Sequence, residues 1–262
     1  MPELPEVETV VRSVRPYLIG KRIVASKFTS PWVTPGNRTK LSARLAGRKI
    51  ESVGRRGKFI LIALDQGTLT VHLGMTGKLL VAGSVDTHTH GIFTLDDGVL
   101  LYHDPRQFGS IEWSPEGSPR VARLGPEPLD VTFDQFWERL RRKARVKALL
   151  LNQSFLAGIG NIYADESLFA AGIHPLAVAA RLSRARAERL HTAIRGILAH
   201  AIELGGSSIS DYVNADGERG WFQMEHRVYG REGEPCANCG GAVRKILVAQ
   251  RGTHFCPRCQ RR

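Results

Sequence analysis

The four cysteines of this 262-residue chain form two Cys-x2-Cys pairs near its C-terminus, separated by sixteen residues. This spacing is typical of a tetrahedral Zn²⁺ site with four thiolate ligands, here Cys236, Cys239, Cys256 and Cys259. Two disulfides are the alternative, which a reducing compartment disfavours. Because four protein thiolates leave zinc no open position, we expect one structural ion that holds "VRKILVAQRGTHF" as a rigid hairpin.

Basic side chains gather in the segment "RLRRKARVK" (139–147), which has six Lys and Arg among nine residues. The "GIGN" turn at 158–161 follows, and its backbone N–H groups would lie at a helix start, where phosphate binds readily. A charged helix face is often simply solvated, and a basic zinc hairpin would equally suit a protein partner. Together, the basic segment, the "GIGN" turn and the basic zinc hairpin predict a surface that binds a nucleic-acid backbone.

The overall charge supports this prediction, since 37 Lys and Arg against 25 Asp and Glu give a formal net charge of +12. An anionic membrane surface is the rival partner, but no basic amphipathic anchor and no apolar run of spanning length stand out. The N-terminus also lacks the basic-then-apolar layout of a secretory signal. We therefore expect a cytoplasmic protein whose partner is nucleic acid.

The elements that must position these groups begin with a helix at "MPELPEVE". Proline is tolerated in a first helical turn, and carboxylates suit the positive N-terminal end of a helix. Apolar residues then recur at three- and four-residue spacing, which predicts one buried helical stripe formed by Leu4, Val7, Val11, Val14 and Leu18.

The remaining pattern predicts three regions. Residues 1–130 contain hairpins around "DQG" and "DDG" and several short strands, which indicate a β-sandwich or barrel. Residues 131–222 have helical periodicity at 133–153 and 183–206, with a helix pair broken by glycines between them. Residues 223–262 are the zinc region. The fold class is α+β and multidomain.

Eight segments specify more than a fold class. They are "MPELPEVETVVR", "RRGKFI", "HLGMTGKL", "DPRQFG", "LGPEPL", "AGIGNIYADESLFAAGIHP", "VYGREGEPC" and "QRGTHFCPRCQ". In this order they resemble formamidopyrimidine-DNA glycosylase, the bacterial repair enzyme for oxidised purines. The resemblance implies an N-terminal catalytic antiparallel β-sandwich domain with an N-terminal helix (1–130). A helical domain with a helix-two-turn-helix motif (131–222) and a zinc finger (223–262) would follow.

The resemblance also implies a bifunctional enzyme that excises 8-oxoguanine and formamidopyrimidines from duplex DNA and then cleaves the strand by β,δ-elimination. After removal of Met1, the nitrogen of Pro2 would form a Schiff base with C1′ of the damaged nucleotide. Glu3 would protonate the sugar ring oxygen, and Glu6 would organise the site. Lys58 and Arg251 would contact phosphate and assist elimination. We expect no cofactor other than zinc, and a monomer.

Further residues match DNA-contacting positions of the family. Met75, Arg106 and Phe108 would fill the gap left by the extruded base, although residue type alone would place Met75 and Phe108 in a core. Phosphate contacts are expected from His88, Arg142, Lys147, Asn161 and Arg251, whereas His72 could equally be a packed strand histidine.

The lid over the extruded base would include Ser207, Ile209, Ser210, Asp211 and Tyr212. Ser210 departs from the family pattern, because many relatives have lysine or arginine there. This departure concerns base recognition and leaves the lyase chemistry intact.

Two alternatives stay open. An endonuclease-VIII-type glycosylase for oxidised pyrimidines shares the proline, Glu3 and the finger, but it usually begins "PEGPE" where this chain has "PELPE". A catalytically inactive zinc-containing DNA-binding protein would need neither Pro2 nor Lys58.

Overall fold

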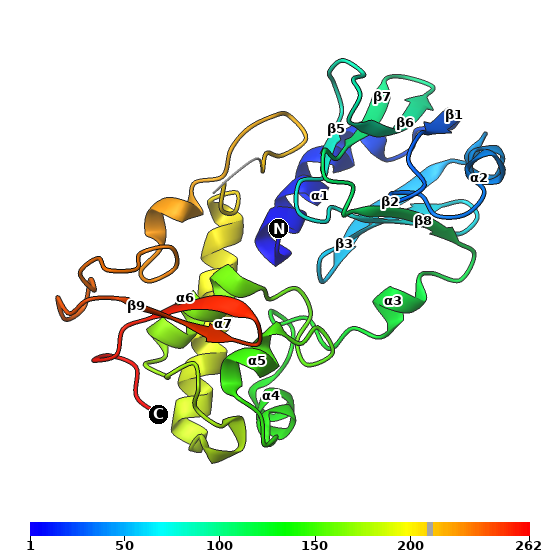
Figure 1. The fold of residues 1–262 in the computed structure, drawn as a ribbon. Helices are drawn as coiled ribbons and strands as arrows, with labels where there is room; N and C mark the ends of the chain where they lie inside the picture. The colour runs from blue at the N-terminus through cyan, green and yellow to red at the C-terminus, as the bar shows by residue number, and fades with distance from the viewer. Residues whose placement is uncertain (209–211) are drawn as a thin grey trace. The chain divides into compact units, whose positions relative to one another are not determined.

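The computed structural model describes residues 1–208 and 212–262. The chain forms two compact units, Met1–Arg123 with Leu204–Trp221, and Leu124–Glu203 with Phe222–Arg262 (Figure 1). The three-region division expected from the sequence stays a prediction. Among the described residues no helix is both long enough and apolar enough to cross a bilayer.

The first unit contains two antiparallel four-stranded sheets. One has the order β1–β6–β7–β5 and consists of β1 (Ile23–Phe28), β5 (Lys78–Leu80), β6 (Thr89–Leu95) and β7 (Val99–His103). The other has the order β2–β3–β4–β8 and consists of β2 (Ile50–Arg56), β3 (Phe59–Leu64), β4 (Thr68–His72) and β8 (Ser110–Ser114). The predicted "DQG" and "DDG" hairpins are confirmed as β3–β4 and β6–β7. Gly67 and Gly98 have positive φ in these turns, which glycine adopts at no steric cost.

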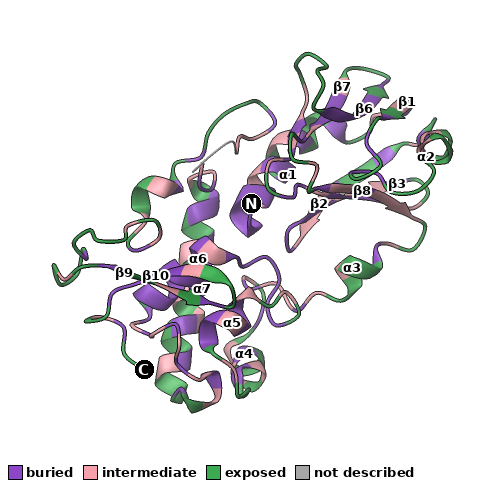
Figure 2. Cartoon of the chain, viewed as in Figure 1, coloured by how far each residue is buried: buried purple, intermediate pink, exposed green. Residues whose placement is uncertain are grey.

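Helix α1 (Leu4–Leu18) covers this unit's core. All five residues of the predicted stripe, Leu4, Val7, Val11, Val14 and Leu18, are fully buried. The helix packs on β2 and also contacts β3 and β5. Figure 2 shows the buried face of α1 in purple. Two short helices, α2 (Arg38–Leu45) and α3 (Pro119–Ala122), complete the unit's regular structure among the described residues.

The second unit is built around two helices, α6 (Asn161–Ala170) and α7 (Arg184–Glu203), which pack on each other. Helix α6 is buried along almost its whole length and also contacts α5 and β10. The other elements are α4 (Phe133–Leu140), α5 (Val146–Leu151), η1 (Ala179–Arg181), η2 (Phe222–Glu225), β9 (Arg244–Val248) and β10 (Arg251–Phe255). The antiparallel β9–β10 pair confirms the predicted hairpin.

Two helical predictions in this unit are wrong. The pattern at 133–153 is interrupted at 141–145, because backbone groups there bond to a distant segment: Val146 N–H donates to Ala177 O and Ala179 N–H to Ala144 O. The expected helix pair is a single helix, α6, preceded by turns at 152–160. Both ends of the Gln153 amide bond backbone groups of these turns, namely Gly158 N–H and Ile159 O.

Together, the sandwich with its N-terminal helix, the helical region and the zinc hairpin confirm the α+β fold class.

Candidate DNA-repair site

The start of α1 holds the two residues that the resemblance assigns to chemistry. Pro2 and Glu3 are buried, and Glu3 is only 3% exposed. Glu3 precedes the helix in an extended conformation, and its backbone N–H donates to Glu6 Oε2 at 2.7 Å. The carboxylate of Glu6 thus fixes the backbone directly behind Pro2.

The other oxygen of Glu6 binds a segment far away in sequence. Glu6 Oε1 accepts a hydrogen bond from Ser207 N–H at 2.7 Å, and the Tyr212 hydroxyl donates to the Glu6 carbonyl at 3.1 Å. A Cβ at Gly206 would lie 2.8 Å from Glu6 Oε1, so glycine permits this approach. Glu6 therefore joins α1 to both described ends of the predicted lid. The lid residues Ile209, Ser210 and Asp211 lie outside the described residues.

Tyr212 is suited to a donor role at this junction. Burial, assisted by the Glu6 carboxylate, raises the pKa of Tyr212 above its usual range. Its hydroxyl, which is protonated at neutral pH in any case, therefore keeps its proton further into the alkaline range.

Lys58 lies at the β2–β3 turn, directly before Phe59 opens β3, and is only 6% exposed. Gly57 supplies the positive φ of this turn. The structure thus places Lys58 on a hairpin, as the sequence resemblance implied.

His72 closes β4 and is packed: its ring centroid lies 4.9 Å from that of Phe59, and Nδ1 accepts from Gly74 N–H at 3.1 Å. Burial, together with the positive charges of Arg120 and Lys58, lowers the pKa of His72 to about 4. A neutral, packed ring favours the strand-histidine alternative, and a phosphate contact by His72 stays a prediction.

Met75 and Phe108 are exposed, by 39% and 58%, so the assignment from residue type alone to a core is wrong. Met75 lies in the loop after β4, and Phe108 in the loop after β7. The guanidinium of Arg106 lies 4.6 Å from the centroid of the Phe108 ring, within cation–π distance. The structure therefore presents all three predicted gap-filling side chains at the surface of the first unit.

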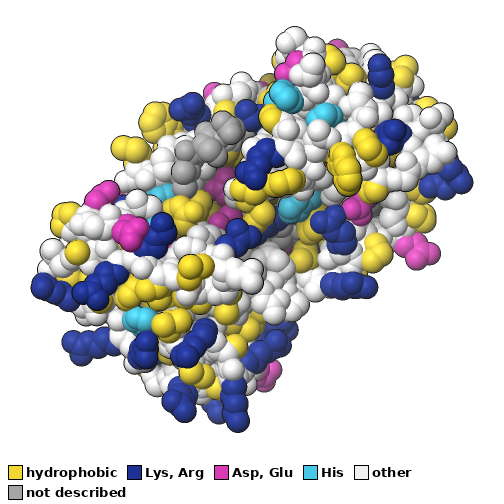
Figure 3. All heavy atoms as spheres, viewed as in Figure 1, with side chains coloured by type: hydrophobic (Ala, Val, Ile, Leu, Met, Phe, Trp, Pro, Cys, Tyr) yellow, Lys and Arg dark blue, Asp and Glu magenta, His cyan; other side chains and the backbone are white. Residues whose placement is uncertain are grey.

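His88 is exposed just before β6, and its ring lies 5.7 Å from that of His103. In the second unit, Arg142 is exposed in the interruption between α4 and α5, and Arg251 is exposed at the start of β10. These positions suit contacts with phosphate, and the contacts themselves stay predictions. Figure 3 shows Lys and Arg side chains spread over the visible face.

Asn161 opens α6 and is half-buried. Its side-chain N–H donates to Gly252 O at 2.8 Å, so it ties the start of α6 to the residue after Arg251. The structure thereby brings together two predicted phosphate-contacting residues that are ninety positions apart in sequence.

The prediction for Lys147 needs correction. Its side chain is fully buried, and Nζ lies 2.5 Å from Asp165 Oδ1. Because both partners have no exposed surface, the ammonium group cannot reach a phosphate from this position. Its place in the fold is to join α5 to α6.

The sequence reasoning missed two neighbouring carboxylates on α6. Asp165 Oδ2 accepts His254 N–H at 2.9 Å, and Glu166 accepts three backbone N–H groups, of Arg227, Val228 and Tyr229, at 2.8–3.0 Å. They hold the zinc hairpin and the chain that leads to it on α6. The signal was adjacent acids in an otherwise apolar helix, since carboxylates are seldom fully buried unless they are partnered.

The four cysteine Sγ atoms lie within 4.8 Å of one another, with Cys236–Cys259 at 3.8 Å and Cys239–Cys256 at 3.5 Å. Zn–S bonds of about 2.3 Å in a tetrahedron require S–S separations of about 3.8 Å, so this set fits zinc. The site holds one structural zinc ion and supplies no reacting group.

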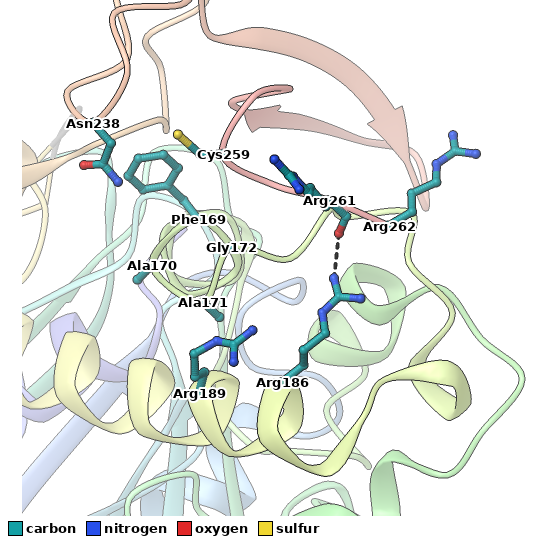
Figure 4. Close-up of a pocket in the computed structure, with 10 residues that line it drawn as sticks. All are labelled: Phe169, Ala170, Ala171, Gly172, Arg186, Arg189, Asn238, Cys259, Arg261 and Arg262. Atoms are coloured by element: carbon teal, nitrogen blue, oxygen red, sulfur yellow. Dashed lines mark hydrogen bonds between the residues drawn. The ribbon is translucent and has the colours of Figure 1, made fainter.

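A separate pocket of about 520 Å³ lies between α7, the end of α6 and the zinc finger. Four arginines, Arg186, Arg189, Arg261 and Arg262, contribute to its lining, and Arg186 donates to the carbonyl of Arg261 (Figure 4). The pocket adds to the positive charge of the second unit, and it contains none of the predicted catalytic residues.

Three family models match the chain: the formamidopyrimidine-DNA glycosylase N-terminal domain at residues 1–111, the H2TH domain of the same enzyme at 124–213, and a zinc finger found in Fpg and IleRS at 233–262. The chain belongs to the formamidopyrimidine-DNA glycosylase family.

Known relatives match over the full length. The formamidopyrimidine-DNA glycosylase of Solibacter usitatus is 57% identical, and that of Geobacillus kaustophilus is 44% identical; both alignments cover 100% of this chain and of the relative. The crystal structure of MutM (Fpg) from Thermus thermophilus superposes with a TM-score of 0.90 at 45% identity, covering 99% of this chain and 98% of that one. A mutant Lactococcus lactis Fpg in complex with Fapy-dG containing DNA gives 0.91 at 38% identity, with full coverage of both chains. The protein is therefore a DNA-binding repair glycosylase.

Proposed function

We propose that the protein is bifunctional: it excises 8-oxoguanine and formamidopyrimidine bases from duplex DNA, and its lyase activity then cleaves the abasic site by β,δ-elimination. The observation that carries this proposal is the buried Pro2–Glu3 pair at the start of α1, fixed by the Glu6 carboxylate that also holds Ser207. Lactococcus lactis Fpg has been captured with Fapy-dG and with abasic-site DNA, which supports this choice of substrates.

The chemistry requires that Met1 be removed, because an amide nitrogen has no available lone pair. The freed Pro2 nitrogen is a secondary amine, and α-amino groups titrate near pKa 7.7–8.0, so about a tenth or more is unprotonated at neutral pH. Its lone pair forms a bond to C1′ while the bond from C1′ to the base breaks. The base leaves with that electron pair and takes up the proton that the proline nitrogen loses. Glu3 protonates the sugar ring oxygen as the ring opens.

The resulting iminium at C1′ is a cationic electron sink that acidifies the C2′ protons. Loss of a C2′ proton breaks the C3′–O bond, and a second elimination breaks the C5′–O bond. Lys58 and Arg251 are the cations we assign to these phosphate leaving groups. Water then hydrolyses the iminium and restores the proline amine.

The base must leave the stack before C1′ can be attacked, which costs a few kcal/mol. We assign the filling of the resulting gap to Met75, Phe108 and Arg106, whose guanidinium can meet the acceptors of the orphaned cytosine. Their exposure at the surface of the first unit supports this role. We expect a monomer that acts on DNA in the bacterial cytoplasm.

The test is borohydride trapping on a duplex with one 8-oxoguanine opposite cytosine, after intact mass has established whether Met1 is absent. Borohydride reduces the iminium to a stable amine, so we expect a covalent adduct that maps to the Pro2 peptide. An adduct only with an oxidised pyrimidine would favour the endonuclease-VIII-type activity. No adduct with either lesion or with an abasic site would leave a DNA binder without lyase chemistry.

A matched variant is Pro2→Gly, which keeps an N-terminal amine but makes it primary. We expect trapping and excision to weaken while duplex affinity persists. Excision by Pro2→Gly at the parent rate would contradict a special role for the secondary amine.

A further inference from the structure

The loops that carry Met75 and Phe108 meet backbone to backbone in the first unit. A Cβ placed on Gly74 would lie 2.4 Å from Gly109 N, and one on Gly109 would lie 1.7 Å from the Tyr102 hydroxyl. Such distances leave no room for a side chain, so the two loops can pack this closely only through glycine. Their backbones therefore form one continuous surface.

A buried carboxylate lies beneath this junction. Asp104 has no exposed surface, and it accepts hydrogen bonds from both loops. Its Oδ1 accepts from the Thr76 hydroxyl at 2.6 Å, and its Oδ2 accepts from Gly109 N–H at 2.9 Å and from the Tyr102 hydroxyl at 3.3 Å. Because buried carboxylates are costly unless they are fully bonded, this arrangement is strongly specified.

The hydroxyl of Thr76 is a second link between the two loops. Its Oγ1 donates to Asp104 and also accepts from Arg106 N–H at 3.3 Å. Thr76 directly follows Met75, and Arg106 is two residues before Phe108. One hydroxyl thus links the chain beside Met75 to the chain that carries Arg106 and Phe108.

The second loop is also fixed at its centre. Gln107 has a φ of 54°, a left-handed conformation that is uncommon for residues other than glycine. Its Oε1 accepts from the Ser30 hydroxyl at 2.6 Å, and its N–H donates to Asp104 O at 3.1 Å. In this loop the Arg106 guanidinium lies over the Phe108 ring.

We propose that Asp104 and Thr76 are positioning residues that couple the two loops, so that Met75, Arg106 and Phe108 enter the DNA stack as one preformed group. This inference rests on the gap-filling role under the proposed function. Because hydrogen bonds to Asp104 and Thr76 hold the two loops together, insertion would not have to bring the three side chains together one by one, and extrusion of the base would become faster.

The test compares Thr76→Val, which removes the hydroxyl at almost unchanged volume, with Thr76→Ser, which keeps it. Base extrusion is followed by the fluorescence of 2-aminopurine beside the lesion, and excision by single-turnover kinetics on 8-oxoguanine opposite cytosine. We expect Thr76→Val to slow both about tenfold and Thr76→Ser to stay within about twofold of the parent, with trapping on a preformed abasic site nearly unchanged in both, since no base remains to be extruded. A purely structural role would instead lower trapping and excision together.

A double-mutant cycle sharpens the test. If the three side chains act as a unit, the losses caused by Met75→Ala and Phe108→Ala should be non-additive in the parent and become additive in the Thr76→Val background. Affinity for a duplex with a non-cleavable 8-oxoguanine analogue, whose base must still be extruded, gives the same cycle without chemistry. Ser30→Ala, which frees Gln107, is the second variant should Thr76→Val fail to fold.

The outcomes separate the two proposals. A parent protein that traps no lesion overturns the proposed function, and the affinity cycle then still tests the coupling. A parent that is active while Thr76→Val extrudes and excises equally fast, with additive losses in both backgrounds, overturns the coupling alone.

Discussion

Helix α1 in the first unit and the β9–β10 hairpin in the second both carry a residue assigned to the chemistry, but they are held in different ways. Behind Pro2, α1 buries its apolar stripe completely, and four of the stripe residues, Val7, Val11, Val14 and Leu18, belong to a core shared with both sheets. The hairpin that carries Arg251 buries Val248 and Phe255, and beside it lies a small cluster of buried residues: Phe169, Val228, Cys236, Val243 and Cys256. The zinc site and the hydrogen bonds accepted by the α6 carboxylates, Asp165 and Glu166, provide the remaining contacts that hold the hairpin in place.

The difference follows from size. A fifteen-residue helix on a sandwich can bury a full apolar stripe, so its position depends on packing and is insensitive to salt and chelators. A short basic hairpin cannot bury enough apolar surface and needs a metal or buried charge instead. The reactivity of the Pro2 nucleophile and the affinity for DNA should therefore be lost under different conditions.

Zinc removal should give the largest effect. Structural zinc contributes about 10–16 kcal/mol in finger peptides, so chelation or Cys256→Ser should unfold the hairpin. We expect the Kd for an abasic-analogue duplex to rise about a hundredfold or more, while the thermal transition of the first unit stays within a few degrees of the parent's. The measurements are zinc content, calorimetry and titration with labelled DNA, with zinc re-addition as the control. Unchanged affinity in zinc-free protein would remove the finger from the contacts.

The substitution Lys147→Met should have the next largest effect. It leaves the Asp165 carboxylate buried without its ionic partner, at an expected cost of about 3–5 kcal/mol in the free energy of unfolding. The matched control is Arg184→Ala, which breaks an exposed pair with Asp134 at a cost of about 1 kcal/mol or less. Denaturant titration of both variants checks this, and equal costs would mean that burial does not distinguish the two pairs.

Leu18→Ala tests the apolar side of the comparison. Leu18 is fully buried at the end of α1, so truncation should lower the free energy of unfolding by about 3 kcal/mol, independently of salt. The adjacent Ile19 is 45% exposed, and Ile19→Ala should change stability by about 0.5 kcal/mol or less. A strong salt dependence of the Leu18→Ala effect would show that α1 does not rely on packing alone.

Mild acid should have the smallest effect, about 1.4 kcal/mol per histidine at about pH 5.5, one unit below the usual pKa. The pKa of His72 falls from its usual 6.5 to about 4 in the folded protein, so the unfolded chain binds the proton first. Stability from His72 is complete above pH 6.5 and is lost as the pH falls through 6.5 towards 4, by at most about 3 kcal/mol at about 1.4 kcal/mol per pKa unit. Burial lowers the pKa of His226, in the second unit, to the same value.

Denaturant titrations from pH 7 to pH 4 measure this slope. His72→Gln and His226→Gln should each remove part of it, which assigns the acid sensitivity to one unit or the other. A slope unchanged in His72→Gln would contradict the assignment of a buried neutral ring.

The sequence by itself determined the features that depend on neighbours along the chain: the α1 stripe, the two glycine hairpins and the zinc spacing. Each is encoded in a local period or turn, and each is confirmed. Together with the eight family segments, they were sufficient for the fold class and the family.

Only the tertiary structure decided where distant segments pair. Backbone bonds to residues 177–179 interrupt the helical pattern at 141–145, and the partner of Lys147 on α6 puts that side chain inside. Glu6 and Ser207, two hundred positions apart in sequence, are hydrogen-bonded, and Asp104 accepts hydrogen bonds from two loops. Sequence periodicity indicates which residues prefer burial. It does not indicate which distant polar group pairs with a buried charge, because those groups come together only in the folded tertiary structure.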